Sequence, residues 1–300
     1  MSRHQQGARD GTREMRVCAA DIGGSHVTAA VVELGPEPRI LARSNSDYDA
    51  DSDRETLLGT MVDTLRGAAA DARQWVIALP GPFDYERGSG SFEGVAKFRA
   101  LAGVDLRSEF SSRLGIAGDR IRFVNDAIAY GIGEWSVSPD RPVRFACITL
   151  GTGIGSAFLD CGQPIESGPE VPPHGWAHLL EIDGEPLEDW VSTRAIQRRY
   201  AEAGGGMLSV REITDRARRE EPRASIVIEA AMVDLGCALA PWFARFLARE
   251  VVVGGSMARS WDVLGPAFER GVENATSMPV RIRPSRLFDD APLIGAAAYR

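Results

Sequence analysis

The sequence lacks the marks of membrane-spanning, nucleic-acid-binding and secreted proteins. No run of eighteen apolar residues occurs in the 300 residues, which argues against a membrane span. Lys and Arg form no run and the formal net charge is −8, which argues against nucleic acid or an anionic membrane as a partner. The first fifteen residues are polar and lack the apolar segment of a signal peptide. We therefore expect a disordered lead-in over 1–15 and a cytoplasmic protein.

Cysteine is scarce, and the common phosphate-binding motifs are absent. The four cysteines (Cys18, Cys147, Cys161 and Cys237) are scattered without the spacing of a zinc site, so we expect reduced thiols. The sequence contains neither GxxxxGKS nor GxxxxGKT, and no GxGxxG, which excludes a P-loop and the Rossmann fingerprint. The composition, 44% hydrophobic and 25% charged, is typical of a globular protein. The length of 300 residues is enough for one large domain or two lobes.

The most informative feature is a glycine turn near the N-terminus. The segment VCAADIGG (17–24) is an apolar run that ends in an acid and two glycines, and a second apolar run follows at 27–34. This pattern predicts a hairpin whose turn lets a ligand approach the backbone, with a hydroxyl donor and a carboxylate for a metal-bound water. The residues concerned are Asp21, Gly23, Gly24 and Ser25. Taken alone, such a turn can serve the fold and nothing more.

A second glycine turn follows an apolar run about 130 residues later. The segment LGTGIGSA (150–157) alternates glycine with other residues after the apolar run 145–150. Two turns of this kind suggest two half-sites that close on the phosphates of one nucleotide. The second set comprises Gly151, Thr152, Gly153 and Gly155. The alternative is a glycine-rich turn with a purely structural role.

Apolar periodicity predicts strands first in each half, with helices between them. We expect strands within 17–34 (two) and at 39–44, 75–79, 121–124, 145–150, 156–160 and 251–253. We expect helices at 54–72, 106–114, 126–135, 187–203, 210–218, 224–248, from about 261, and at 291–300. The segment 83–101 is glycine-rich and irregular, and a loop of that length is often functional. Three strands and a helix occur twice, which predicts an α/β fold with a weak internal repeat.

Asn125 and Asp126 are the catalytic candidates. They stand where a predicted buried strand passes into a helix. Ligands of open α/β sheets bind at the carboxyl ends of strands, so both side chains would face a site there. Asp126 would then be a general base that accepts a proton from a sugar hydroxyl. A simple helix cap is the alternative for an acid at this place.

At this point the chain resembles the ROK sugar kinases of the actin-like and hexokinase-like ATPase superfamily, over roughly residues 16–300. Asp21-Ile-Gly-Gly-Ser25 resembles the first phosphate motif of that superfamily, and the turn at 150–155 resembles its second. Val252-Val-Gly-Gly-Ser256, with Gly254 and Gly255, is similar to the adenosine motif. Asn125 and Asp126 are similar to the sugar-binding and catalytic pair.

The resemblance implies two ribonuclease-H-like α/β lobes around a central cleft. ATP with Mg²⁺ would lie between the glycine turns, with Asp21 bound to the metal through water, and a hexose would lie beneath. The N-terminal lobe would span 16–124 and the C-terminal lobe 125–287, and a terminal helix (288–300) would pack back on the N-terminal lobe. Members of the family are commonly dimers, so a homodimer is expected.

The sugar-binding part of the family pattern is only partly present. A GExGH segment of typical members corresponds to His174–His178 here, so His178 fits the histidine while Gly175 replaces the glutamate. Glu188 resembles a second sugar-contacting glutamate. A core histidine and an acid favoured by the helix dipole are the structural alternatives for His178 and Glu188.

The cysteine cluster that binds structural zinc in most members is absent from 180–188. The sequence therefore predicts no zinc, as in the branch that includes polyphosphate- and ATP-dependent glucokinases. The segment 91–97 also differs from the usual sugar loop. Its Glu93 and Lys97 would contact a polar substituent of the sugar or remain solvated charges.

The resemblance thus predicts an ATP-dependent hexose 6-kinase with glucose as the default substrate. A kinase of an amino sugar such as kanosamine, from antibiotic biosynthesis, is the alternative, because the sugar loop is atypical and a glutamate is replaced. The donor could also be polyphosphate, although no Lys/Arg cluster is evident in the sequence. From another class, we consider a non-catalytic sugar-sensing ROK protein. Repressors of that kind carry an N-terminal winged helix of about seventy residues. Only about fifteen polar residues precede the first predicted strand here, so we do not expect this function.

Overall fold

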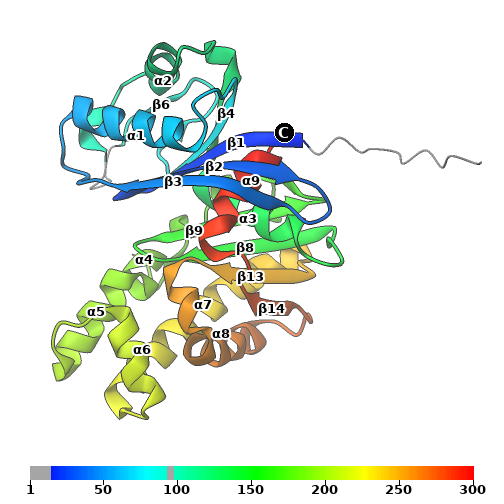
Figure 1. Ribbon diagram of the computed structural model, residues 1–300. Coiled ribbons are helices and arrows are strands. Elements are labelled where there is room, and N and C mark those ends of the chain that lie inside the picture. Colours follow the sequence, from blue (N-terminus) through cyan, green and yellow to red (C-terminus); the bar gives the residue numbers. More distant parts are fainter. Residues whose placement is uncertain (1–14, 93–97) are drawn as a thin grey trace, which may run out of the picture.

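The computed structural model describes residues 15–92 and 98–300. The predicted lead-in, apart from its last residue, and the loop residues Glu93 and Lys97 lie outside this range. Two five-stranded sheets form the two lobes of the described chain, and helices lie on both faces of each sheet (Figure 1). The architecture is the two-lobed α/β fold that the sequence predicted.

The first sheet has the strand order β3-β2-β1-β4-β7. β1 and β2 are antiparallel and joined by the first glycine turn, whereas β4 and β7 run parallel to β1. The strands are β1 (Met15–Ile22), β2 (His26–Leu34), β3 (Arg39–Asp47), β4 (Trp75–Leu79) and β7 (Ile121–Asn125). The interior strand β4, between β1 and β7, is apolar throughout because helices cover both of its faces.

Two helices cover the outer face of the first sheet: α1 (Arg54–Ala68) and α2 (Leu106–Leu114). Each begins at an aspartate whose side chain accepts an N–H of the first turn, Asp53 for α1 and Asp105 for α2. A small hairpin of β5 (Phe83–Asp84) and β6 (Ser89–Gly90) lies in the segment predicted to be irregular.

The second sheet has the order β10-β9-β8-β13-β14 and repeats the glycine hairpin of the first. β8 and β9 are antiparallel. β13 pairs with β8, and β14 pairs with β13, both in parallel orientation. The strands are β8 (Arg144–Leu150), β9 (Ile154–Asp160), β10 (Gln163–Pro164), β13 (Glu250–Gly254) and β14 (Arg281–Pro284). A further two-stranded sheet joins β11 (Glu181–Ile182) and β12 (Glu185–Pro186).

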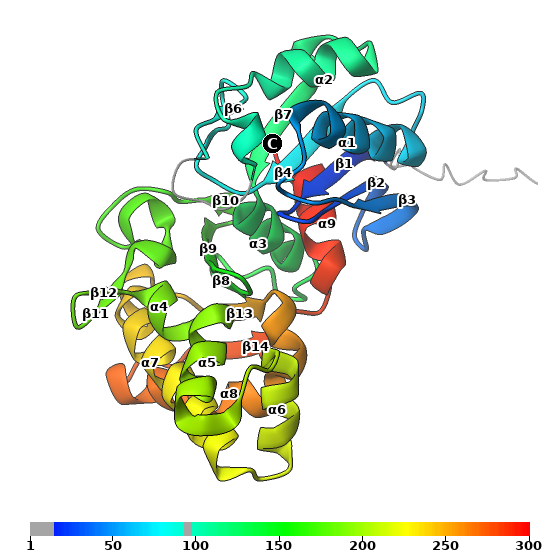
Figure 2. The same ribbon diagram turned by 90° about the vertical axis from the view of Figure 1, so that its left-hand side faces the viewer.

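Helices α3 (Asp126–Ser136) and α9 (Ala291–Ala298) lie between the two sheets (Figures 1 and 2). Their backbones approach so closely that a Cβ on Gly133 would overlap the carbonyl of Ala291, and one on Gly295 would overlap that of Ala129. Glycine is required at this crossing because any side chain would separate the helices. The last helix thus ties the end of the chain to both lobes.

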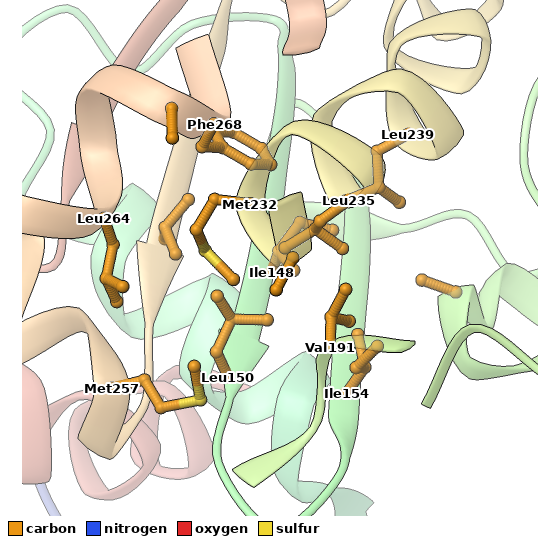
Figure 3. Close-up of a cluster of buried hydrophobic side chains, with 14 of the residues drawn as sticks. Ile148, Leu150, Ile154, Val191, Met232, Leu235, Leu239, Met257, Leu264 and Phe268 are labelled. Carbon is orange, nitrogen blue, oxygen red and sulfur yellow. The ribbon is translucent and has the colours of Figure 1, made fainter. Parts of the chain in front are cut away.

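The remaining helices cover the other face of the second sheet. They are α4 (Leu187–Val191), α5 (Thr193–Tyr200), α6 (Val210–Arg218), α7 (Pro222–Phe246) and α8 (Trp261–Ala275). Figure 3 shows the core between them, where Met232, Leu235 and Leu239 of α7 meet Ile148 of β8 and Phe268 of α8. Each such buried side chain contributes about 1.5–3 kcal/mol of stability.

Helix α7 is the one described helix long and apolar enough to cross a membrane. Half of the apolar window is buried inside the protein. Its buried residues pack on α8 and on the second sheet, which accounts for the composition of a core helix.

Most predicted elements are confirmed to within a few residues. The two-residue strands β5, β6, β10, β11 and β12 were not predicted, and two longer segments also differ. The helix predicted at 187–203 is interrupted at Ser192, which is extended and caps α5 by accepting the N–H of Ala195. The strand β14 was not predicted, because only two of its four residues are apolar, one of them proline.

Candidate active site

Three parallel strands of the first sheet end at one edge, and the two predicted carboxylates lie there. Asp21 on β1 is level with Ala78 on β4, and Leu79 on β4 is level with Asn125 on β7. Asp126 follows as the first residue of α3. The order of strands therefore brings Asp21 and Asp126 to the same edge from opposite sides of β4.

The cap of α3 is Asn125, and Asp126 is the first residue of the helix proper. The Asn125 side-chain oxygen accepts the N–H groups of Ala127 (3.0 Å) and Ile128 (3.1 Å). Its amide nitrogen donates to the hydroxyl of Tyr85 (3.0 Å). Asn125 is thus the cap residue. Asp126 stands in the first turn, where its Oδ1 also accepts the N–H of Ala127 (2.8 Å) and the helix dipole favours its anionic form.

Asp21 is a largely buried carboxylate among other acids, with 19% of its side chain exposed. Burial, together with the charges of Asp126 and Asp289, raises its pKa to about 7. Imidazole Nε2 of His26 lies 3.9 Å from its Oδ2. No group of three His, Cys, Asp or Glu residues suited to a metal occurs in 15–92 and 98–300. A cation held by one carboxylate and water, as Mg²⁺ is, fits this acidic place.

The first glycine turn is closed on itself and supported by Tyr48. Gly23 donates its N–H to the carbonyl of His26 (2.9 Å). The hydroxyl of Tyr48 donates to the Gly23 carbonyl, and its own N–H donates to the carbonyl of Ser25 (3.0 Å). Gly24 stands between these two anchored residues. The turn is therefore fixed before any ligand arrives.

The second glycine turn is held by Glu188 of α4. Gly151 donates its N–H to the carbonyl of Gly153 (3.1 Å), and the side chain of Thr152 is exposed at the tip. A Glu188 carboxylate oxygen accepts the N–H of Ile154 (2.8 Å). That oxygen occupies the space a Cβ on Gly153 would need. Glu188, predicted to contact sugar, thus also shapes the phosphate turn.

This turn lies against the first turn of α3. A Cβ added to Gly155 would lie 2.7 Å from that of Ala127, the neighbour of Asp126. Glycine at 155 therefore allows the strand after the turn to approach the catalytic helix.

The predicted adenosine turn adjoins the second phosphate turn. Gly255 has a φ of 80°, and a Cβ there would overlap the carbonyl of Leu150. A Cβ on Gly151 would lie 3.6 Å from the hydroxyl of Ser256. Gly254, level with Thr149 of β8, ends the strand. Two glycine turns about 100 residues apart in the sequence thus lie in direct contact.

His178 lies within electrostatic reach of two predicted site acids, Glu188 and Asp126. Its ring is stacked on Trp176 with centroids 5.5 Å apart. Burial lowers its pKa below the usual 6.5, while the charges of Glu188 and Asp126 oppose that change. Near neutral pH the imidazole is therefore uncharged and offers one donor and one acceptor, as binding a sugar hydroxyl requires.

Gly175 has a structural reason to be glycine. Its φ is 72°, and a Cβ there would lie 3.2 Å from the carbonyl of Ile165 and 3.4 Å from Cα of Glu166. Glu166, which this close contact involves, lies within electrostatic reach of Tyr85, because its charge raises the pKa of the Tyr85 hydroxyl. Partial burial raises the pKa of Glu166.

The sequence analysis did not assign Glu166, Tyr85, His174 or Tyr48 to the site. The aromatic residues of 83–101 were the available signal for Tyr85, since that segment was expected to be functional.

The architecture places the protein in the class of two-lobed actin-like ATPases. The model of the ROK family matches residues 17–300, so the chain belongs to the ROK family. A glucokinase of Thermotoga maritima is 23% identical over 95% of this chain and 97% of that protein. An N-acetylmannosamine kinase of Haemophilus influenzae is 23% identical over 95% of both chains. The structure of a ROK family glucokinase from Streptomyces griseus in complex with glucose and AMPPNP superposes with a TM-score of 0.76, at 22% identity over 95% and 98% of the two chains.

Proposed function

We propose that this protein is an ATP-dependent hexose kinase that phosphorylates the 6-hydroxyl of glucose or a glucose-like sugar, with Asp126 as the general base. The observation that carries the proposal is the contact of the second glycine turn with the first turn of α3, between Gly155 and Ala127. A phosphate-binding turn and a carboxylate are thereby held side by side, as phosphoryl transfer to a hydroxyl requires.

The chain is a sugar kinase of the ROK family, and the remaining details rest on its own residues. Asp126 accepts the proton of the attacking hydroxyl while the new oxygen–phosphorus bond forms and the bond to the leaving β-phosphate oxygen breaks. Asn125 keeps the acid in place because its side chain is fixed by two N–H groups and Tyr85. A neutral His178, together with Glu188, binds the anomeric side of the sugar.

The donor phosphates are bound by the two glycine turns, and the adenosine by the turn at Gly254 and Gly255. Because glycine carries no side chain, the phosphates and the adenosine can approach the backbone of these turns closely. Mg²⁺, when bound, would neutralise charge on the transferred group and would be held through water by Asp21. Ionised Asp21 is stabilised by such a cation, which offsets the burial that raises its pKa.

Glucose is the default acceptor, and an amino sugar such as kanosamine is the second candidate. The second is favoured by Glu166, a carboxylate beside His174 and Tyr85 that a protonated amine would pair with. Glucokinases and N-acetylmannosamine kinases both occur among the relatives, so the comparison favours neither.

A coupled ADP-release assay with Mg²⁺-ATP against a sugar panel tests the proposal. The panel contains glucose, glucosamine, N-acetylglucosamine, N-acetylmannosamine, mannose, fructose and kanosamine. On the best sugar, Asp126→Asn should lower kcat by about 10²–10⁴-fold. Asp105→Asn is the matched control, because Asn caps α2 as well as Asp does and α2 lies on the outer face of the first sheet. Activity retained in Asp126→Asn refutes the assigned base, and silence with ATP and polyphosphate on all sugars refutes the kinase.

A further inference from the structure

Helix α3 carries three polar side chains at intervals of four residues: Asp126, Tyr130 and Glu134. Residues at this spacing lie along one stripe of a helix, one turn apart. Asp126 belongs to the proposed mechanism. The other two are buried, Tyr130 with 8% and Glu134 with 0% of its surface exposed, and the mechanism gives neither a role.

Tyr130 contacts the adenosine turn with both its ring and its hydroxyl. A Cβ on Gly254 would overlap the Tyr130 ring, so the glycine lies flat against it. The Tyr130 hydroxyl accepts the N–H of Gly255 (3.2 Å) and donates to the hydroxyl of Ser285 (2.9 Å). Helix α3, which carries Asp126, is therefore hydrogen-bonded to the Gly254–Gly255 turn, although the two bonded residues are 125 positions apart in the sequence.

The direction of these hydrogen bonds is fixed by Glu134. Ser285 donates to a Glu134 carboxylate oxygen (2.6 Å), which also accepts the N–H groups of Arg286 and Leu287 (both 2.8 Å). A carboxylate only accepts, so the proton of Ser285 points to Glu134, and that of Tyr130 points to Ser285. The lone pairs of Tyr130 are left facing Gly255. The network thus prepares the tyrosine as an acceptor for that one N–H group.

We propose that Tyr130 is a positioning residue for the nucleotide, because its hydroxyl fixes the Gly254–Gly255 turn to the helix that carries Asp126. The inference rests on the proposed function, in which that turn binds adenosine. Gly255 also packs on the carbonyl of Leu150, immediately before the second phosphate turn. Displacing Gly255 therefore moves the nucleotide relative to the base, whereas His178, the proposed sugar-binding residue, is held by its own stacking on Trp176.

Tyr130→Phe removes one oxygen atom and keeps the ring against Gly254. A lost hydrogen bond of ordinary strength weakens binding by about 3- to 10-fold. We expect KM for ATP and Kd for ADP to rise by that factor, with KM for the sugar unchanged. Ser285→Ala, which removes the acceptor for the Tyr130 proton, should change the nucleotide constants in the same direction.

Tyr200→Phe is the matched control. Tyr200 is a fully buried tyrosine of the same lobe whose hydroxyl bonds to Glu221 and Arg216. Its loss should leave both KM values unchanged. Amide hydrogen exchange of a peptide covering 253–257, measured without nucleotide, should be faster in Tyr130→Phe alone.

Each outcome bears on the inference separately from the proposed function. Equal rises in both KM values, or no change in nucleotide affinity and exchange, overturn the positioning role. A wild-type protein that binds no ADP overturns the proposed function and the inference with it. If the wild-type protein binds ADP and Tyr130→Phe has the same Kd for ADP, the positioning role of Tyr130 is overturned and the proposed function is not affected.

Discussion

Replacing Asp21 with asparagine should stabilise the ligand-free protein while abolishing its activity. The amide occupies the same volume as the carboxylate and carries no charge. In the folded protein, burial together with the charges of Asp126 and Asp289 raises the pKa of Asp21 from 3.8 to about 7. Ionised Asp21 is therefore tolerated in the unfolded chain and disfavoured in the folded one, and Asn removes that conflict.

The pH dependence gives the magnitude. Below pH 3.8 Asp21 is protonated in both states, so its protonation equilibrium costs no stability. As the pH rises through 3.8 the unfolded chain loses the proton first, and stability falls until the folded state ionises near pH 7. One pKa unit corresponds to about 1.4 kcal/mol, so the cost is about 2 kcal/mol at pH 5 and about 4 kcal/mol at pH 8.

Urea unfolding in EDTA at pH 5 and pH 8 measures this effect. The stability gained by Asp21→Asn over the wild type should be about 2 kcal/mol larger at pH 8 than at pH 5. Asp63→Asn is the control, because Asp63 is an acid of α1 with 79% of its side chain exposed, and its difference should be the same at both pH values. A gain for Asp21→Asn that is independent of pH would show that its surroundings do not disfavour the charge.

Three stability predictions are checked by the same unfolding measurements. Gly59→Ala should stabilise by about 0.5–1 kcal/mol, because Gly59 lies inside α1 with open space around the new methyl group. Gly295→Ala should destabilise by at least about 1–3 kcal/mol, because the methyl group overlaps a backbone carbonyl of α3. Arg283→Met should cost about 3–5 kcal/mol, because it leaves the buried carboxylates of Glu134 and Glu250 without that partner. Equal stabilities for the two glycine variants, or an unchanged Arg283→Met, would contradict these arguments.

The fold was predictable where local signals agree with the tertiary structure. Both glycine hairpins and the helix starting at Asp126 follow from apolar runs that end in polar or glycine residues. The strand β14 was not predictable, because its pairing with β13 depends on Arg283 reaching buried carboxylates rather than on an apolar pattern. The interruption at Ser192 had a local signal, a serine followed by a helix, that an apolar pattern spanning it concealed.

The candidate site was predictable in its glycines and acids, and less so in what supports them. The turn residues stand next to the strands that present them, so the sequence displays them together. Tyr130 lies inside an apolar helix pattern, and its two hydrogen-bond partners are 125 and 155 residues away. Glu166 likewise packs against Gly175, nine positions further along the chain. Contacts of this kind leave no periodic trace in a single sequence.

The carboxylates of the candidate site and its glycine turns at 150–155 and 254–255 extend from different sheets, so the distance between them depends on how the two sheets are joined. Asp21 and Asp126 both extend from the first sheet, which fixes them relative to one another. The second phosphate turn and the Gly254–Gly255 turn both extend from the second sheet. The distance between carboxylates and phosphates therefore depends on how the two sheets are joined, and α3 lies between them. Asp126 and Tyr130 are separated by one rigid helical turn, about 6 Å along the axis, so the bond from Tyr130 to Gly255 fixes the reacting groups to the same element. A relative movement of the sheets that leaves this bond intact must carry the Gly254–Gly255 turn, the proposed nucleotide site, along with Asp126, the proposed base.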